Sequence, residues 1–552
     1  MSDEQAFRTG AMGGWRRVTG HRLGLRLARF RRAEDGALII FALVLFILMT
    51  MMGGIAVDLM RFEATRTTLQ NTLDRSTLAA ASLTQTLNPA EVVKDYFIKA
   101  GLAEYLTSVQ VSRGINFRQV AADAKADTRP MFLHMMGVDE FHAPGHSMAE
   151  QRVNNVEIML VLDVSGSMAS NSRLVNLKVA ANSFIDTVLA SDAERRISIG
   201  IVPFNGQVNL GTTLIAKYNA PYPTNVADVN CVDLPASVYN DSAISRTLAL
   251  PRTAHSDTYS GSSQSSSYIA YTDTSNGTLN LGNVWCPPRP GNIVRLPSQS
   301  ITGLQGQING LTAVGATSIN AGLKWGLALL DPSARGMYDE FVLAGNIPAA
   351  LSGRPYEYTD NEAMKVIVLM TDGEHFIEER VDERYKSGVS PIYRSVNDNN
   401  YSIFHSAQAG ANKYWVPHLG TWQALPWTNS GNTGTATQQT WPQVWANMRQ
   451  SYVAWQFYGR PSGTTAYNAA RADFRAQTPV LTMDSQLQSI CSLAKTNGVI
   501  VYGIAFEAPT NGQAQIRACS TSTAHYFNAA GLQISTAFNA IASNISQLRL
   551  TQ

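Results

Sequence analysis

The spacing of hydrophobic positions changes several times along the 552-residue chain, and the first change marks a membrane segment. Residues 37–57 contain no charged side chain. A helix of this length rises 1.5 Å per residue and spans roughly 30 Å, the hydrocarbon thickness of a bilayer. We therefore predict a transmembrane helix over 37–57. A buried core helix would usually be shorter, and a cleaved signal peptide would be followed by small residues, whereas Asp58-Leu-Met-Arg-Phe-Glu63 follows here.

Helical spacing continues beyond the apolar stretch. Leucines and Phe62 recur at near-helical intervals until Asn88-Pro89 ends the pattern. The helix is therefore expected to continue out of the bilayer. Residues 89–150 mix short helical and strand-like patterns, so 58–150 are predicted to form this helix and a small membrane-proximal module.

From residue 151 onward, short apolar runs alternate with helical patterns. Strands are predicted over 156–162, 197–204, 365–370 and 499–506, and helices over 174–188, 319–330, 486–495 and 532–548. Short continuous apolar runs are typical of strands buried on both faces. Because strands and helices alternate, the pattern predicts an α/β fold with a parallel sheet covered by helices on both faces.

Two long stretches interrupt this alternation, at about 206–298 and 376–480. Both are too long for connecting loops and are interpreted as insertions. The first is rich in serine, threonine, asparagine, tyrosine and proline, and the second carries six of the nine tryptophans. These tryptophans are expected to form a small core of the second insertion or a recognition surface, since aromatic residues serve both purposes.

The distribution of charge predicts the orientation in the membrane. The net charge is only +2, which weakens a nucleic-acid-binding function. Residues 1–36, however, carry eight arginines against four acidic residues, so this tail is +4 and the remainder is −2. Positive segments next to a span stay in the cytoplasm. We predict a single-pass inner-membrane protein with a cytoplasmic N-terminus and with residues 58–552 exported to the periplasm.

The four cysteines fit an oxidising compartment. They are Cys231, Cys286, Cys491 and Cys519, and they can pair in three ways. Proximity in sequence favours Cys231–Cys286 and Cys491–Cys519. No C-x-x-C motif supports a zinc ribbon or a thioredoxin-like site.

Oxygen-bearing side chains gather where predicted strands end. The first group is Asp163-Val-Ser165-Gly-Ser167; Thr317 precedes a helix, and Asp372 follows another apolar strand. Ligand sites in open parallel sheets lie beyond the carboxyl ends of the strands. Five oxygen donors suit Mg²⁺ better than zinc, which prefers histidine and cysteine. With only two charged members, the set would leave a bound cation seeking an anionic ligand.

These residues resemble a von Willebrand factor A domain, a Rossmann-like fold, and its metal-ion-dependent adhesion site. The resemblance rests on residues 156–204, the Gly-Ala-Thr loop at 315–317, the strand ending in Thr-Asp-Gly and the C-terminal strand and helix. It implies that Ser165, Ser167 and Thr317 contact Mg²⁺, or Mn²⁺ or Ca²⁺, directly. Asp163 and Asp372 would do so directly or through water, and a partner's carboxylate would complete the shell.

The N-terminal part resembles TadG-like proteins of the Tad (Flp) pilus-assembly system. The resemblance rests on Arg31-Arg-Ala-Glu-Asp-Gly36 before the apolar span and on Asp58 with the Leu/Ala-rich helix after it. The C-terminal segment from Cys491 through Tyr526-Phe527 to Leu548-Arg-Leu550 is also similar. Pilin-like relatives have glutamate at the fifth position after the glycine, for peptidase cleavage. Phe41 stands there in this chain, which favours a retained anchor.

We therefore expect a non-enzymatic binding or structural protein of pilus assembly or adhesion, which docks an acidic group of a protein partner through a metal. One alternative is a metal-assisted hydrolase with Glu374 or His375 as general base. Another is a chelatase-like subunit that works with a cytoplasmic AAA+ ATPase. His142 and His146 flank Pro144 and are expected to be surface residues rather than ligands.

Overall fold

The computed structural model describes residues 35–82, 85–113, 117–152, 155–190, 192, 195–221, 226, 229–256, 284–360 and 362–546. The arginine-rich tail lies almost wholly outside these residues, as does the serine-rich part of the first predicted insertion. The chain divides into two compact units. One consists of Met1–Ser112 and Arg118–Gln151, and the other of Arg113–Phe117 and Arg152–Gln552.

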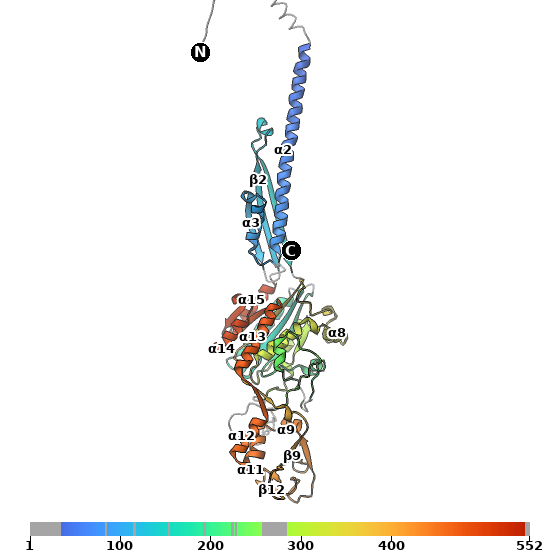
Figure 1. Ribbon diagram of the computed structural model, residues 1–552, viewed down its shortest axis with the longest axis vertical. Helices are drawn as coiled ribbons and strands as arrows, with labels where there is room; N and C mark the ends of the chain where they lie inside the picture. Colours follow the sequence, from blue (N-terminus) through green and yellow to red (C-terminus); the bar gives the residue numbers. More distant parts are fainter. Residues whose placement is uncertain are drawn as a thin grey trace, which may run out of the picture. The chain divides into compact units, whose positions relative to one another are not determined.

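A single long helix dominates the N-terminal unit. Helix α2 runs from Asp35 to Ala81 and includes the predicted span (Figure 1). Among the described residues it is the one helix long and apolar enough to cross a membrane. Its N-terminal half exposes large apolar side chains, such as Leu38 (73%) and Phe46 (67%). Such a surface suits lipid and would be unfavourable in water.

The C-terminal half of α2 packs in a small module. This module also contains α3 (Pro89–Lys99) and a three-stranded sheet in the order β1 (Leu106–Arg113), β2 (Phe117–Thr128), β3 (Phe141–Arg152). Alternate residues of β2 are buried, as expected for a strand with one covered face. They share one core with Leu69 and Leu73 of α2, and they are Val120, Ala122, Ala124 and Ala126.

A six-stranded sheet forms the centre of the second unit. Its spatial order is β16 (Tyr526–Ala529), β15 (Ile500–Phe506), β7 (Ala363–Thr371), β4 (Asn155–Asp163), β5 (Ile197–Phe204), β6 (Arg295–Ser298). Counted along the chain, this is the doubly wound order 3-2-1-4-5-6. Five strands are parallel, and the edge strand β6 is antiparallel to β5. The order reverses between β4 and β7, where such sheets bind ligands.

Helices cover both faces of this sheet, which confirms the predicted α/β fold. Helices α7 (Ile319–Leu330), α8 (Arg335–Leu343), α13 (Val480–Thr496) and α14 (Thr510–Cys519) contribute to the core on one face. Helices α4 (Arg173–Ala190), α6 (Ile301–Gly310) and α15 (Gln533–Ser546) contribute to the core on the other. Along β4, Met159 and Val161 face the first core, whereas Ile158, Leu160 and Leu162 face the second.

Residues of the second predicted insertion build a core of their own. The strands are β8 (Glu378–Val381), β9 (Val389–Ser395), β10 (Tyr401–Phe404), β11 (Tyr414–Val416), β12 (Thr421–Gln423), β13 (Ala436–Thr440) and β14 (Arg475–Thr478). The helices are α9 (Trp441–Asn447), α10 (Gln450–Val453), α11 (Arg460–Ser462) and α12 (Thr464–Asp473), with a π-helix, η9, at Ala454–Gly459. Trp415, Trp441 and Trp445 belong to this core. Trp422 and Trp455 pack against it, so five of the six tryptophans of this stretch belong to the core or contact it.

The first predicted insertion contains less regular structure. Its helix α5 spans Gly211–Ile215, and the strand β6 of the central sheet lies in its last residues.

Two buried lysines connect the insertions to their surroundings. Lys324 of α7 donates to the carbonyls of Asp241, Ser242 and Ala243 at 2.6–3.1 Å. Lys386, in the second insertion, forms a buried ion pair with Asp233 of the first.

The disulfides are those that proximity in sequence predicts. Cys231 bonds Cys286, and Cys491 bonds Cys519. The first closes a loop in the first insertion, across a separation of 55 residues. The second joins α13 to α14 on one face of the sheet. No free cysteine is found among the described residues.

A buried ion pair connects the two central strands near their starts. Glu157 of β4 and Lys365 of β7 are partners in the strand register, and Lys365 Nζ lies 2.5 Å from Glu157 Oε2. Lys365 also donates to the Leu330 carbonyl at the end of α7, at 2.9 Å. Both side chains are less than 5% exposed. Charges so deeply buried depend on each other, because neither can be solvated by water.

Lys365→Met should therefore lower the free energy of unfolding by about 3 kcal/mol, since it leaves the buried Glu157 carboxylate with the more distant Arg354 guanidinium, at 3.9 Å, as its cationic partner among the described residues. Urea unfolding of the full chain in detergent, monitored by circular dichroism, measures the change. The double variant Glu157→Gln/Lys365→Met removes both charges and should recover much of the loss. Equal losses in the single and double variants would contradict the role assigned to the pair.

Candidate metal centre

Asp163 is the last residue of β4, at the point where the strand order reverses. Its carboxylate is buried and held by two donors. Oδ1 accepts the Ser165 N–H at 2.8 Å, and Oδ2 accepts the Thr371 hydroxyl at 2.5 Å. Since Thr371 ends β7, this second bond ties the ends of the two central strands together. The Asp163 side chain therefore has a fixed orientation.

The loop after Asp163 turns tightly so that its two serines stay close together. The Gly166 N–H donates to the Gly315 carbonyl at 2.9 Å, and a Cβ at Gly166 would lie 3.2 Å from that oxygen. Glycine therefore suits this close approach. Ser165 precedes the 3-10 helix η3 (Gly166–Ala169) without capping it through its side chain. Its hydroxyl lies instead 3.0 Å from the Ser167 hydroxyl.

Asp372 completes a cluster of four predicted ligands. It follows β7 directly, and its Oδ1 accepts the Ser167 hydroxyl at 2.8 Å and lies 3.5 Å from the Ser165 hydroxyl. The structure therefore brings Asp163, Ser165, Ser167 and Asp372 together, although about 200 residues of chain separate Asp372 from the others.

Thr317 lies next to this cluster. It comes from the loop before α7, where Gly315 has a φ of +83°, a conformation that favours glycine. A Cβ at Gly373 would lie 3.7 Å from the Thr317 hydroxyl oxygen, and the Thr317 carbonyl accepts the Phe376 N–H at 2.9 Å. The fifth predicted ligand thus borders the segment that carries Asp372.

The two carboxylates share a poorly solvated site. Burial raises the pKa of the Asp163 carboxyl to about 7, and the charge of Asp372 adds to this shift. Burial also raises the pKa of Asp372, against the hydrogen bonds from Ser167 and Arg173, which lower it. Two buried carboxylates flanked by hydroxyls are a donor set that fits a hard divalent cation. Metal binding itself stays a prediction.

Arg173 is a member of the site that the sequence analysis missed. It begins α4, and its guanidinium bridges Asp372 Oδ2 and Glu507 Oε2, both at 2.8 Å. The hydrogen bond from Arg173 lowers the pKa of the Glu507 carboxyl. A cation in the first turn of a helix opposes the helix dipole, so it needs an anionic partner nearby. That mismatch is the sequence signal that could have identified Arg173.

One of the two candidate general bases of the hydrolase alternative is engaged in structural hydrogen bonds. His375 is buried, and both ring nitrogens have partners. Nδ1 lies 2.7 Å from Asp484 Oδ1, and Nε2 accepts the backbone N–H of Asn320, at the start of α7, at 3.0 Å. Because Nε2 accepts that bond, it is not free to take a proton. Glu374 is exposed.

The other histidines of interest lie on the surface of the N-terminal unit, as expected. His142 and His146 on β3 pair with Asp127 and Asp123 of β2, at 2.5 and 2.7 Å. Asp127, Glu140 and His142 could present atoms to one ion, but all three are exposed. Asp127 also pairs with Lys125, and Glu140 with Arg129. Existing ion pairs therefore account for this cluster.

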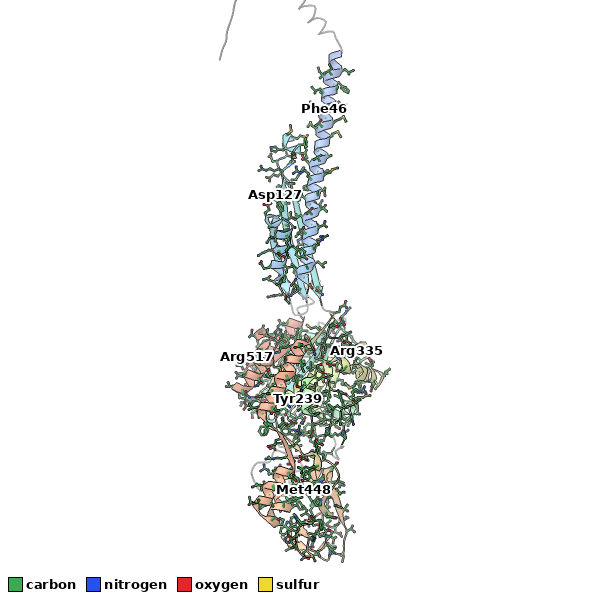
Figure 2. All side chains as sticks on the ribbon, viewed as in Figure 1. Phe46, Asp127, Tyr239, Arg335, Met448 and Arg517 are labelled. Carbon is green, nitrogen blue, oxygen red and sulfur yellow. A yellow bond between two sulfur atoms is a disulfide. The ribbon has the colours of Figure 1, made fainter. Side chains whose placement is uncertain are left out.

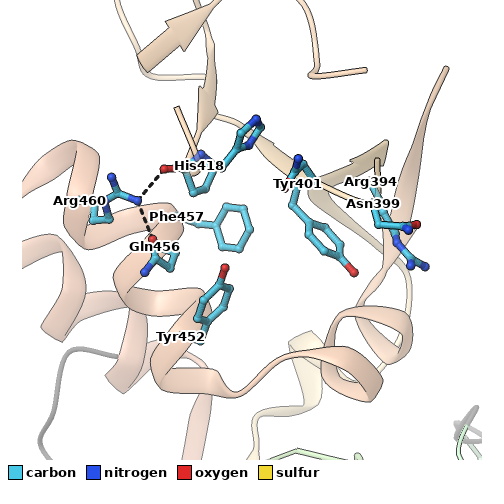
Figure 3. Close-up of a pocket in the computed structure, with 10 residues that line it drawn as sticks. Arg394, Asn399, Tyr401, His418, Tyr452, Gln456, Phe457 and Arg460 are labelled. Atoms are coloured by element: carbon cyan, nitrogen blue, oxygen red, sulfur yellow. Dashed lines mark hydrogen bonds between the residues drawn. The ribbon is translucent and has the colours of Figure 1, made fainter. Parts of the chain in front are cut away.

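A cavity of about 430 Å³ lies within the second insertion (Figure 3). Aromatic side chains, amides and two arginines line it, including Tyr401, Phe457, Arg394 and Arg460. The Arg460 guanidinium donates to the Pro417 carbonyl and to Gln456 Oε1, at 2.6 and 2.8 Å. None of the five predicted metal ligands lines this cavity.

Comparison with protein families identifies the N-terminal segment. Residues 36–83 match the model described as putative Flp pilus-assembly TadE/G-like. This match confirms the resemblance predicted for the span and the helix that follows it. No curated protein matches the chain.

Solved structures similar to the chain include three pilus proteins. The pilus adhesin SpaC from Lactobacillus rhamnosus GG is 11% identical over 80% of this chain, with a TM-score of 0.28, and the chain spans only 34% of SpaC. The vWF domain of the type V pili tip protein Mfa5 from Porphyromonas gingivalis is 13% identical, over 72% of this chain and 98% of that domain (TM-score 0.29). The PilB minor pilin from Streptococcus sanguinis is 11% identical over 81% of this chain and 78% of the pilin, with a TM-score of 0.29. Since these likenesses are weak, the fold assignment rests on the strand order.

Arg173→Met should lower the free energy of unfolding by about 2 kcal/mol in the absence of divalent cations, because it removes hydrogen bonds to two carboxylates. Chemical unfolding in EDTA tests this. Lys178→Met is a matched control in the same helix, since Lys178 donates to the Asn309 carbonyl at the surface of the described part of the chain, and it should change the value by less than about 0.5 kcal/mol. Equal effects of the two substitutions would argue against the role of Arg173.

Proposed function

We propose that this chain is a membrane-anchored binding protein of Tad (Flp) pilus assembly or adhesion, which docks an acidic group of a protein partner at the Asp163–Asp372 site. The observation that carries the proposal is the convergence of Asp163, Ser165, Ser167 and Asp372 at the switch point of the sheet. The same chain bears a TadE/G-like segment at 36–83, which supports the pilus system as the context.

In this proposal, Asp163, Ser165, Ser167, Thr317 and Asp372 hold Mg²⁺, or Mn²⁺ or Ca²⁺ in its place. A cation held mainly by hydroxyls would offer an open position to a carboxylate oxygen of the partner. The fit is supported by the two buried carboxylates with raised pKa values, which gain from any nearby positive charge. Arg173 supplies such a charge to Asp372, at the side of the site nearest Glu507.

We further propose that the N-terminal tail is cytoplasmic and that the unit carrying the site is exported. The eight arginines before the span support this orientation. Two disulfides in the second unit support an oxidising compartment. A chelatase-like function would require the opposite location for the site.

Asp163→Ala should abolish cation-dependent capture of the partner while the chain stays folded. Mg²⁺ binding by the purified chain is measured by calorimetry, and partner capture from pilus-forming cells is compared with and without EDTA. Asp186→Ala is the control, since Asp186 lies on α4 and accepts a surface hydrogen bond from Gln305. Capture that withstands both EDTA and Asp163→Ala would overturn metal-bridged docking.

The orientation is tested separately with reporters. Alkaline phosphatase fused after Gln552 should be active, because it folds only when exported, and a fluorescent protein fused before Met1 should fluoresce in the cytoplasm. An inactive phosphatase fusion, together with a fluorescent C-terminal fusion, would favour the chelatase-like alternative.

A further inference from the structure

The connection between β2 and β3 ends in an exposed apolar tip. Residues 130–138 contain no aspartate, glutamate, lysine or arginine. Four large apolar side chains of this stretch are exposed, namely Met131 (64%), Phe132 (37%), Met135 (85%) and Met136 (53%). Loop tips are usually formed by glycine, proline and small polar residues. So much exposed apolar surface at a tip is typical of a site that contacts another molecule or a membrane.

The tip is held against α2 by an aspartate. The Asp58 carboxylate accepts the backbone N–H groups of Met131, Phe132 and Leu133, at 2.8, 2.7 and 2.9 Å. Asp58 is only 2% exposed. Hydrogen bonds to a charged acceptor are stronger than neutral ones, so three of them fix the position of the tip along the helix.

A glycine on α2 provides the second contact. A Cβ at Gly54 would lie 2.3 Å from the Phe132 ring, so only glycine lets the ring lie against the helix backbone. Gly54 belongs to the uncharged stretch 37–57, and Asp58 is the first charged residue after it. Figure 1 shows the β2–β3 connection beside α2, on the side of the module toward the apolar half of the helix.

We propose that this tip, Met131 to Met136, is a second membrane contact that enters the boundary between lipid headgroups and acyl chains where α2 leaves the bilayer. The proposal rests on α2 being the membrane anchor. If Gly54 lies within the hydrocarbon edge, Phe132 lies there as well, because the two are in contact. Apolar side chains of α2 at the same level along the helix are exposed too, since Met52 is 71% and Met60 72% exposed.

The composition of the tip, rather than the charges beside it, agrees with a lipid surface as its occupant. Arg129 before the tip pairs with Glu140 after it, so these two charges offset each other. Methionine side chains adapt to irregular apolar surroundings such as the edge of the acyl chains. The two contacts together would limit rotation and tilt of α2, which one helix alone leaves free.

Fluorescent labelling of the full chain tests this proposal. The four native cysteines are bonded in pairs, so a single added cysteine can be labelled selectively. The chain is reconstituted in vesicles of phosphatidylcholine and phosphatidylglycerol, with an environment-sensitive dye at Met135→Cys. The matched control is Ile98→Cys on α3, which is also exposed (64%) and apolar but lies away from the tip.

The dye at position 135 should emit at shorter wavelength than the dye at 98. Lipids with a nitroxide near the headgroup should quench it at least twofold more strongly. Asp58→Ala, which removes the acceptor of three N–H groups, should bring the quenching at 135 toward the value at 98. Equal emission and quenching at 135 and 98 would overturn the proposal. So would protection of position 135 from aqueous iodide without quenching by lipid, which would indicate a protein occupant.

A probe at Phe46→Cys separates this proposal from the anchor on which it depends. Phe46 is exposed within the uncharged stretch (Figure 2). Deep quenching at 46 without quenching at 135 would refute the tip contact and leave the anchor intact. Absence of quenching at 46 would refute the anchor, and the tip contact with it.

Discussion

The parallel pairing of β4 with β7 is the constraint on which the candidate site depends. The two strands are neighbours in the sheet but not in the chain, since α4, β5, the whole first insertion, α6, α7 and α8 come between them. Their register places Asp163 opposite the end of β7, so that Asp372 lies one step beyond. A shift by one residue would turn every side chain of β7 to the other face and remove Asp372 from the cluster. The buried Glu157–Lys365 pair at the other end of the strands disfavours such a shift, because each charge would lose its partner.

Much of the fold could be predicted from periodicity alone. The central strands are continuous apolar runs, and such runs have few other interpretations in a chain where they alternate with helices. The antiparallel β6 and the short β16 carry only four residues each, too few to produce a pattern. In the membrane-proximal module, β2 is rich in alanine and charged residues, so its alternation emerges only once α2 covers one face.

The candidate site was only partly accessible to sequence reasoning. Asp163 and Asp372 can be identified from the sequence, because each follows a strongly apolar run that predicts a buried strand. The position of Arg173 in a first helical turn is a sequence signal, but its partners Asp372 and Glu507 can be identified only when α4 and β15 are packed on the same sheet, since they are distant in sequence. His375 illustrates the reverse case. Its position shortly after Asp372 suggested a catalytic base. In the folded chain, however, its two ring nitrogens form hydrogen bonds with Asp484 and with the backbone N–H of Asn320.

The central position of β4 has a mechanical consequence. β4 is the first strand of the second unit, so its beginning continues from the unit that contains α2, and its end carries Asp163. Tension between a partner held at Asp163 and an anchored α2 would therefore run along β4 itself. This strand has parallel neighbours on both sides, and its hydrogen bonds to β5 and β7 lie across that direction. Because both points of attachment lie on β4, the covalent backbone of this strand would carry the load, and its hydrogen bonds to β5 and β7 would be largely spared.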